Sequence, residues 1–199
     1  MLKMNYIRIR QSLCSRTFFG VDDVQNTLGI TRESARVVCT RLYRQGLIVR
    51  LKRDFYVLRE KWDNLSYRES LKIANYLQVP SYISCMSALT YYDISTQVQR
   101  SYVESIALKR SKYFEIEGAV FRYLKISKRL YTGFIQREGI FIATPEKAFL
   151  DTLYLYSFGK YTFDLPSLSL EKLSEGKVKG LLNDYPPKTQ RSFKKLWKS

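Results

Sequence analysis

The 199-residue sequence contains no histidine, and its three cysteines, Cys14, Cys39 and Cys85, lie far apart. Without histidine the chain lacks the commonest general base and the usual partner of cysteine in zinc sites. An odd number of widely spaced cysteines argues against a disulfide framework and favours a reducing compartment, the cytoplasm. Histidine-dependent catalysis and Cys/His metal sites are therefore excluded.

Other signatures are also missing. No apolar run approaches the roughly 18 residues of a membrane span, and the first ten residues lack the apolar stretch of a secretory signal. There is no Walker A motif and no GxGxxG, and the carboxylates of Asp22, Asp23 and Asp151 do not form a two-metal set. We expect no membrane association, no cofactor, no metal and no enzymatic activity, although the residue inventory leaves a carboxylate-only or lysine-based site open.

The sequence has an excess of basic residues. It carries 34 Lys and Arg against 18 Asp and Glu, a net charge of +16. The surplus is concentrated at the two ends, because residues 1–59 have a net charge of +8, residues 177–199 of +6, and the longer middle only +2. A general basic background would be spread more evenly, so this distribution favours a phosphate-rich partner such as nucleic acid.

The segment 21–29 predicts a short helix. Val21, Val24 and Leu28 fall on one helical face, and acidic residues occupy the first turn, where they suit the helix dipole. Gly29 then stands where a left-handed residue commonly ends a helix.

A second helix is predicted over 31–45, with Thr31 as its N-cap and Gly46 at its end. At 100° per residue, Ala35, Val38 and Leu42 lie on the inner face. The opposite face carries Glu33, Arg36, Val37, Thr40 and Arg44, flanked by Arg32 and Arg41. Arginine can donate two hydrogen bonds to a guanine edge, so this outward face suits the major groove of DNA.

Two β-rich runs, 47–52 and 55–58, flank a short polar turn and predict a hairpin, the wing. Lys52 and Arg53 at its tip are expected to contact phosphate or the minor groove. Either feature alone is commonly a solvated surface, but their order predicts a winged helix-turn-helix over residues 1–59. A helix in 1–16 would precede it, with Tyr6, Ile7 and Leu13 as core contacts. The predicted DNA-binding residues are Thr31, Arg32, Arg36, Thr40, Arg41, Arg44, Lys52 and Arg53.

After a linker at 60–65, residues 66–199 predict a second, mixed α/β domain, so the fold class is α+β. Ser66 and Glu69 fit a capping box at the start of a helix that Pro80 ends. A short extended segment at 82–84 and a helix at 86–92 follow. Residues 102–142 are β-like, with a turn at 117–118, and predict a small antiparallel or mixed sheet covered by helices.

Thr144 and Pro145 predict a sharp helix start after an apolar strand. The polar residues Glu146, Lys147 and Asp151 could form a partner or ligand site, but we favour a structural helix start that fixes neighbouring loops. The basic tail 177–199 predicts a short amphipathic helix around Phe193, whose lysines either extend the DNA footprint, contact an acidic partner or are simply solvated.

Three features in this order resemble the AbiEi family. They are a winged helix that ends in a Tyr-Val-Leu strand, the segment 80–84 leading into Ser-Ala-Leu-Thr-Tyr-Tyr at 87–92, and Ile-Ala-Thr-Pro-Glu-Lys-Ala-Phe-Leu-Asp at 142–151. The resemblance covers roughly residues 15–160, and the Thr-Pro-Glu-Lys-Ala stretch is its most specific part. The last ~35 residues match nothing in the family pattern.

This family comprises the antitoxins of type IV toxin–antitoxin and abortive-infection systems. The resemblance implies a bacterial repressor whose winged helix binds inverted repeats in double-stranded DNA of its own promoter. It also implies a C-terminal domain that counteracts a nucleotidyltransferase-type toxin, without implying direct contact with that toxin. A ligand-responsive winged-helix regulator with a C-terminal sensor domain is the alternative, and an enzyme acting on nucleic acid is a third possibility.

Overall fold

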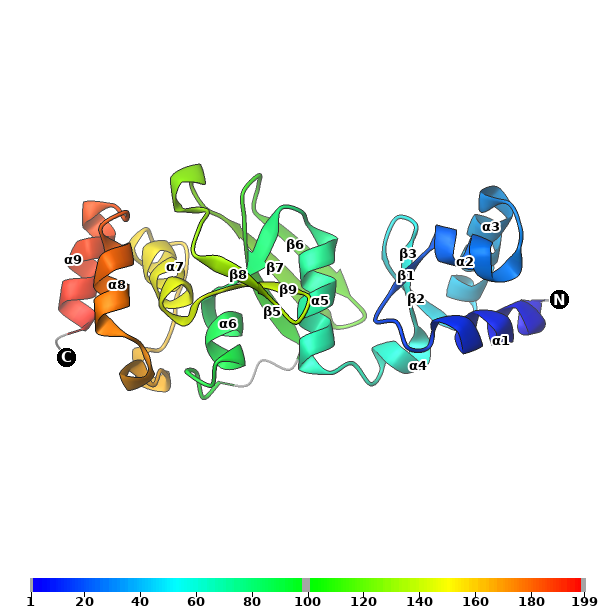
Figure 1. Ribbon diagram of the computed structural model, residues 1–199, viewed down its shortest axis with the longest axis horizontal. Helices are drawn as coiled ribbons and strands as arrows, with labels where there is room; N and C mark the ends of the chain where they lie inside the picture. Colours follow the sequence, from blue (N-terminus) through cyan, green and yellow to red (C-terminus); the bar gives the residue numbers. More distant parts are fainter. Residues whose placement is uncertain (1, 98–100, 198–199) are drawn as a thin grey trace. The chain divides into compact units, whose positions relative to one another are not determined.

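A computed structural model describes residues 2–97 and 101–197, and the last two residues of the basic tail lie outside this part. The chain divides into two compact units, Met1–Ile73 and Ala74–Ser199, and combines helices with two β-sheets (Figure 1). The predicted α+β class is confirmed. Among the described residues, no helix has both the length and the apolar character to cross a bilayer.

The N-terminal unit contains helices around a three-stranded antiparallel sheet of order β1-β3-β2. In chain order its elements are α1 (Leu2–Leu13), β1 (Phe19–Gly20), α2 (Val21–Leu28), α3 (Arg32–Arg44), β2 (Ile48–Lys52), β3 (Phe55–Leu58) and α4 (Arg59–Trp62). This is the order of a winged helix-turn-helix, with the β2–β3 hairpin as the wing.

Local chemistry sets the turn between α2 and α3. Gly29 adopts φ 67°, and its N–H donates to the Gln25 carbonyl, which ends α2. The Thr31 hydroxyl accepts from the Ser34 N–H at 3.3 Å and so caps α3. Both predicted signals are confirmed, and they fix the direction in which α3 leaves the turn.

The core of this unit contains the predicted inner face of α3, with Ala35, Val38 and Leu42 all buried. One prediction was wrong: Ile7 of α1 is 46% exposed, and Ile9 is the fully buried residue instead. The tract Tyr-Ile-Arg-Ile-Arg alternates, so either isoleucine could have faced inward, and packing against α2 and α3 selects Ile9.

Three further features differ from the sequence prediction. The two-residue strand β1 pairs with β3 and had no sequence signal of its own. The expected linker at 60–65 is partly helical, because α4 covers Arg59–Trp62 and buries Trp62. The boundary between the units lies within α5 (Tyr67–Leu77), later than the sequence suggested.

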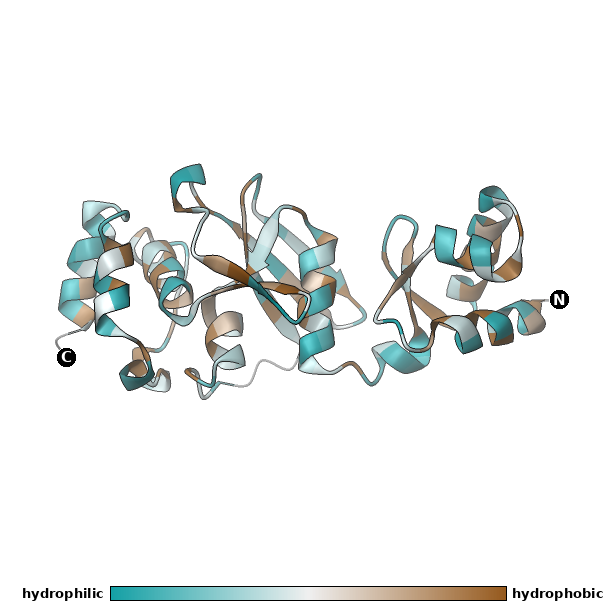
Figure 2. Cartoon of the chain, in the orientation of Figure 1, coloured by the Kyte–Doolittle hydropathy of each residue, from teal (hydrophilic) through white to brown (hydrophobic). Residues whose placement is uncertain are grey.

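The C-terminal unit is built on a six-stranded mixed sheet of order β6-β7-β5-β4-β9-β8. The pairs β5–β7 and β4–β9 are parallel, and the other neighbours are antiparallel. Figure 2 shows apolar residues along its strands. After α5, the elements are β4 (Ser81–Ile83), α6 (Cys85–Tyr91), β5 (Tyr102–Ala107), β6 (Lys112–Ile116), β7 (Ala119–Lys125), η1 (Lys128–Leu130), β8 (Phe134–Arg137), β9 (Ile140–Ala143), α7 (Pro145–Ser157), η2 (Leu165–Ser167), η3 (Leu170–Lys172), α8 (Glu175–Leu182) and α9 (Pro187–Leu196).

The predicted tail helix is α9, and it is packed onto the unit. Phe193 is buried, stacks on Trp197 at 5.0 Å between ring centroids, and Trp197 meets the Phe149 ring of α7 edge-on at 5.8 Å. The apolar side of the tail therefore belongs to the core, and its lysines occupy the outer side.

Candidate nucleic-acid interface

The outward face of α3 is open to solvent along its length. Glu33, Thr40, Arg41 and Arg44 are exposed, and Val37 is 49% exposed although it is apolar. Among the described residues, neither Arg41 nor Arg44 forms an ion pair with a carboxylate. This face thus offers cations, one carboxylate, a hydroxyl and one apolar group to a partner.

Two arginines of α3 are held by carboxylates within the unit. The Arg36 Nη2 lies 2.8 Å from Asp54 Oδ2, and its Nε lies 3.3 Å from Asp54 Oδ1. Arg32 donates from Nε to Asp22 at 2.6 Å, and its Nη2 lies 3.8 Å from Asp54 Oδ2. Helix α3 is therefore connected by ion pairs to both α2 and the wing.

The tip of the wing is a two-residue turn, Arg53-Asp54. Asp54 adopts φ 63°, and its carbonyl accepts from the Val21 N–H at 3.1 Å, which fastens the turn to the start of α2. The hydrogen bond from Arg36 lowers the pKa of the Asp54 carboxyl, and the same bond raises the pKa of Arg36. Both groups are thus charged throughout the neutral range.

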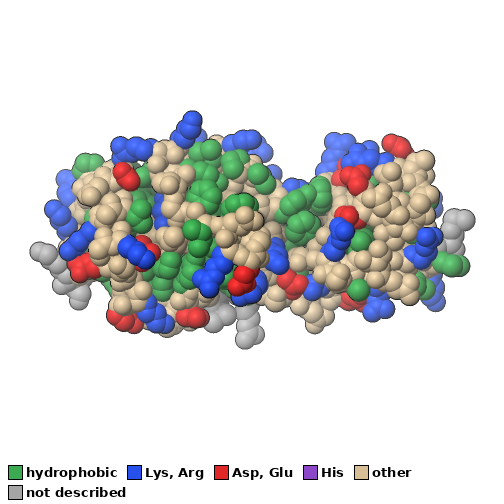
Figure 3. Space-filling view, viewed as in Figure 1, with side chains coloured by type: hydrophobic (Ala, Val, Ile, Leu, Met, Phe, Trp, Pro, Cys, Tyr) green, Lys and Arg blue, Asp and Glu red, His purple; other side chains and the backbone are tan. Residues whose placement is uncertain are grey.

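A pocket of about 210 Å³ lies between α3 and the wing. Its lining contains three guanidinium groups and a single carboxylate, so its net formal charge is positive. Figure 3 shows Lys and Arg side chains gathered over the part of this unit that carries the wing tip, with acidic side chains beside them. A pocket of this charge and size can accept one phosphate group. It is lined by Arg36, Thr40, Arg50, Arg53, Asp54 and Tyr56.

The structure brings three of the eight predicted residues, Arg36, Thr40 and Arg53, to this one pocket. Thr31 serves as the helix cap, and Arg32 pairs mainly with Asp22. The other predicted residues lie elsewhere on the same surface: Arg41 and Arg44 along α3, and Lys52 with its ammonium 5.2 Å from the Phe55 ring centroid.

Sequence reasoning missed Arg50, Asp54 and Tyr56 of the pocket. Arg50 is the exposed residue between the buried Val49 and Leu51 of β2, and that alternation was a usable signal. The sequence contained no such signal for Asp54, because an acidic residue in a basic turn is typical of any solvent-exposed loop. Its role depends on an ion pair with a residue 18 positions earlier.

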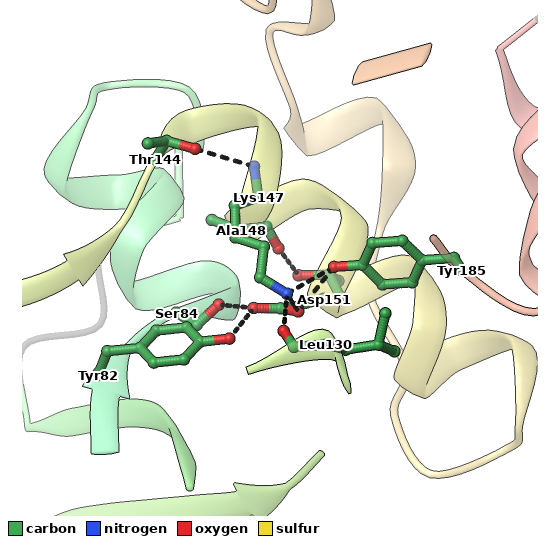
Figure 4. Close-up of polar contacts among 9 residues, drawn as sticks. Tyr82, Ser84, Leu130, Thr144, Lys147, Ala148, Asp151 and Tyr185 are labelled. Atoms are coloured by element: carbon green, nitrogen blue, oxygen red, sulfur yellow. Dashed lines mark hydrogen bonds and ion pairs between the residues drawn. The ribbon is translucent and has the colours of Figure 1, made fainter. Parts of the chain in front are cut away.

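The polar residues that follow Thr144 form a buried cluster in the C-terminal unit (Figure 4). The Lys147 ammonium donates to Asp151 Oδ1 at 2.6 Å, to the Tyr185 hydroxyl at 2.7 Å and to the Leu130 carbonyl at 2.7 Å. Asp151 also accepts from the hydroxyls of Tyr82 and Ser84 at Oδ2, at 2.9 and 2.8 Å.

This cluster is closed. Lys147 is 1% exposed and Asp151 0%, and the three ammonium protons each have an acceptor within the protein. The cluster joins α7 to β4, to η1 and to the segment before α9. The geometry supports the structural interpretation of Lys147 and Asp151 over a ligand site, since a ligand would have to displace satisfied partners. Glu146 likewise accepts from the Ser174 N–H.

In comparisons with known proteins, no family model and no curated protein matches the chain. Among solved structures, the RV2827C protein of Mycobacterium tuberculosis has a similar fold, with a TM-score of 0.63 and 11% sequence identity. The match covers 98% of this chain and 76% of that one. The likeness therefore concerns the fold, and extends over both units.

Proposed function

We propose that the chain is a DNA-binding transcriptional autorepressor and the antitoxin of a type IV toxin–antitoxin system. The observation that carries the DNA-binding part is the pocket between α3 and the wing, which is lined by Arg36, Arg50 and Arg53 and is large enough to admit a phosphate group. Its position beside the exposed face of α3 is that expected of a winged helix on a duplex.

In this proposal α3 enters the major groove and the wing lies along the phosphate backbone. Arg36, Arg41 and Arg44 face the bases or the groove walls, and Arg50 and Arg53 bind phosphate. Val37 supplies an apolar contact of the kind that distinguishes thymine by its methyl group.

The antitoxin part is supported by the resemblance of residues 80–92 and 142–151 to the AbiEi family. The C-terminal unit would counteract a nucleotidyltransferase-type toxin, and the operator would contain inverted repeats. The closed cluster at Lys147 would then hold the unit's shape, without taking part in chemistry.

DNA binding is tested by fluorescence anisotropy with two duplexes of equal length, one from the region upstream of the reading frame and one with the same bases scrambled. We expect tighter binding to the upstream duplex. Arg36→Ala should weaken that complex by about 1–3 kcal/mol. Lys3→Ala, on the exposed side of α1, is the control and should change little. Equal affinity of the wild type for both duplexes would contradict the proposal.

The antitoxin role is tested separately by co-expression with a nucleotidyltransferase-type reading frame adjacent in the genome. We expect the wild-type chain to restore growth. Arg36→Ala should lose repression of a promoter reporter while it still restores growth, because the substitution lies in the N-terminal unit. Failure of the wild type to restore growth would leave a repressor without an antitoxin role.

The alternative of a C-terminal ligand sensor expects an enclosed apolar pocket. Two pockets of the C-terminal unit have mixed linings: one of about 370 Å³ combines Leu77 and Val79 with Lys109, Arg110 and Lys112, and one of about 430 Å³ combines Leu124, Ile126 and Leu155 with Lys125 and Lys160. Neither pocket is both enclosed and predominantly apolar, so neither favours the sensor.

A further inference from the structure

Asp54 is a single carboxylate in a basic pocket. It lies among Arg32, Arg36 and Arg53, all of which lower its pKa, and Arg50 lines the same pocket. A negative charge at a surface that binds phosphate weakens the attraction to every duplex, whatever its sequence. Attraction to phosphate alone would favour a neutral or basic residue at position 54, so the carboxylate of Asp54 must have another role.

The ion pair uses only one edge of the Arg36 guanidinium. Asp54 accepts from Nε and Nη2, which together make the side edge of the group. A guanidinium has five N–H donors, so the end-on edge formed by Nη1 and Nη2 keeps a pair of donors. Among the described residues, Asp54 is the one side chain that accepts from this guanidinium. The end-on edge matches the paired O6 and N7 acceptors of guanine.

The carboxylate is itself held in place. Asp54 adopts φ 63°, in a turn whose carbonyl is bonded to the Val21 N–H at the start of α2. The Asp54 side chain is 20% exposed and that of Arg36 is 37% exposed, so the pair is partly shielded. An arginine fixed in this way has lost much of its rotamer freedom before a ligand arrives, and less entropy is lost on binding.

From this geometry we infer that Asp54 is a positioning residue that aims Arg36 at a guanine. The wing tip would then contribute to the choice of base as well as to backbone contact. This inference rests on the proposed DNA-binding function and adds a specificity device to it. Loss of the carboxylate would leave Arg36 without its anchor, which should weaken binding to the specific duplex. It would also remove a negative charge that repels phosphate, which should not weaken binding to other duplexes and could strengthen it.

The test is Asp54→Asn, since asparagine is nearly the same shape and also tolerates a positive φ. We expect roughly tenfold weaker binding to the upstream duplex, which corresponds to one poorly made guanine contact. Binding to the scrambled duplex should be unchanged or tighter. The ratio of the two dissociation constants is decisive, because both are measured on the same preparation and the ratio does not depend on the active fraction.

Asp63→Asn is the matched control. Asp63 is an exposed acid of the same unit, 3.7 Å from Arg59, and lies outside the α3–wing pocket. Its loss should shift both duplexes by the same factor. A second control is Arg36→Ala, in whose background Asp54→Asn should no longer lower the ratio, because the residue that it positions is gone.

The outcomes separate the two proposals. A wild type that binds both duplexes equally overturns the DNA-binding function itself. A wild type that discriminates, with an Asp54→Asn variant that keeps the full ratio, overturns the positioning role and leaves the function intact. A lowered ratio that persists in the Arg36→Ala background also overturns it, since Asp54 would then act through another group.

Discussion

At the residue scale, Lys147 and Lys179 make the same kind of ion pair in opposite surroundings. Each lies one helical turn from an acid, at 2.6 Å, but the side chains of Lys147 and Asp151 are 2% and 0% exposed whereas those of Lys179 and Glu175 are 61% and 52% exposed. Coulombic attraction at the surface is screened, and its contribution is small. In the core, removal of one partner leaves a buried charge.

We therefore predict that Lys147→Met lowers the free energy of unfolding of the C-terminal unit by about 3–5 kcal/mol. The matched control Lys179→Met should cost no more than about 0.5 kcal/mol. Urea titrations followed by tyrosine and tryptophan fluorescence measure both. If the two variants had equal midpoints, the cluster around Lys147 would not be an anchor of the fold.

Glu104 is a second buried acid, 1% exposed on β5. Burial raises the pKa of its carboxyl above the ordinary value of 4.5, and a hydrogen bond from Tyr161, the charge of Arg122 and the Met86 backbone oppose this shift. The folded state then binds more protons than the unfolded state between pH 4.5 and the raised pKa. The contribution of Glu104 to stability consequently decreases as the pH rises through this window.

Glu104→Gln removes this titration and keeps an acceptor for Tyr161. We predict that the variant's unfolding free energy changes less with pH than that of the wild type from about pH 4.5 upward, by at most about 1.4 kcal/mol per pH unit. Urea midpoints at successive pH values provide the comparison. Glu115→Gln, at an exposed position of β6, should preserve the wild-type profile. Parallel curves for Glu104→Gln and wild type would contradict the prediction.

At the scale of elements, the features that could be predicted are those set by neighbours three or four residues apart. The Ser66 hydroxyl accepts from the Glu69 N–H while the Glu69 carboxylate accepts from the Ser66 N–H, as the capping box predicted. The Thr144 hydroxyl accepts from the Lys147 N–H and caps α7 by this single bond. The turn at 117–118 joins β6 to β7, a pairing between adjacent strands.

What could not be predicted depends on long separations. The parallel pairings β5–β7 and β4–β9 could not be predicted. The residue pattern of a strand indicates which of its faces are buried, but it does not indicate which other strand lies beside it. The ion pair between Arg36 and Asp54 has the same character. The site was therefore only partly predictable: the basic helix face is periodic, whereas the acid that fixes one of its arginines is not.

The loop before β8 offers a test at this scale. Gly133 has φ 74°, and a Cβ there would lie 3.1 Å from Cγ and Cδ of Lys147, which three hydrogen bonds hold in place. Gly159 has φ 70°, but a Cβ there would meet no atom of the described residues within 4 Å, so it isolates the backbone cost. We predict that Gly159→Ala costs roughly 1–2 kcal/mol and Gly133→Ala about 1–3 kcal/mol more. Thermal melts of the two variants give the difference, and equal losses would mean that Lys147 can move.

At the scale of the whole molecule, the net charge of +16 attracts any polyanion, and the proposed function requires more than attraction. Three of the basic residues in 1–59, Arg36, Arg50 and Arg53, line a pocket on α3 and the wing, whereas the basic residues of α9 lie on the outer side of a packed helix. These two groups of cations should differ in how they respond to salt, because only contacts that neutralise phosphates release condensed counterions.

We predict that the Arg50→Gln, Arg53→Gln double variant flattens the plot of log affinity against log salt by roughly 1.8, or about 0.9 for each lost phosphate contact. Arg191→Gln, Lys194→Gln removes the same number of charges from exposed positions of α9 and should change the slope by much less, since charges that do not contact phosphate act only through a screened field. Anisotropy titrations of the upstream duplex at several salt concentrations measure both slopes. If both double variants flattened the plot equally, the tail would also contact DNA. If the Arg50→Gln, Arg53→Gln variant kept the wild-type slope, the pocket would not be part of the DNA interface.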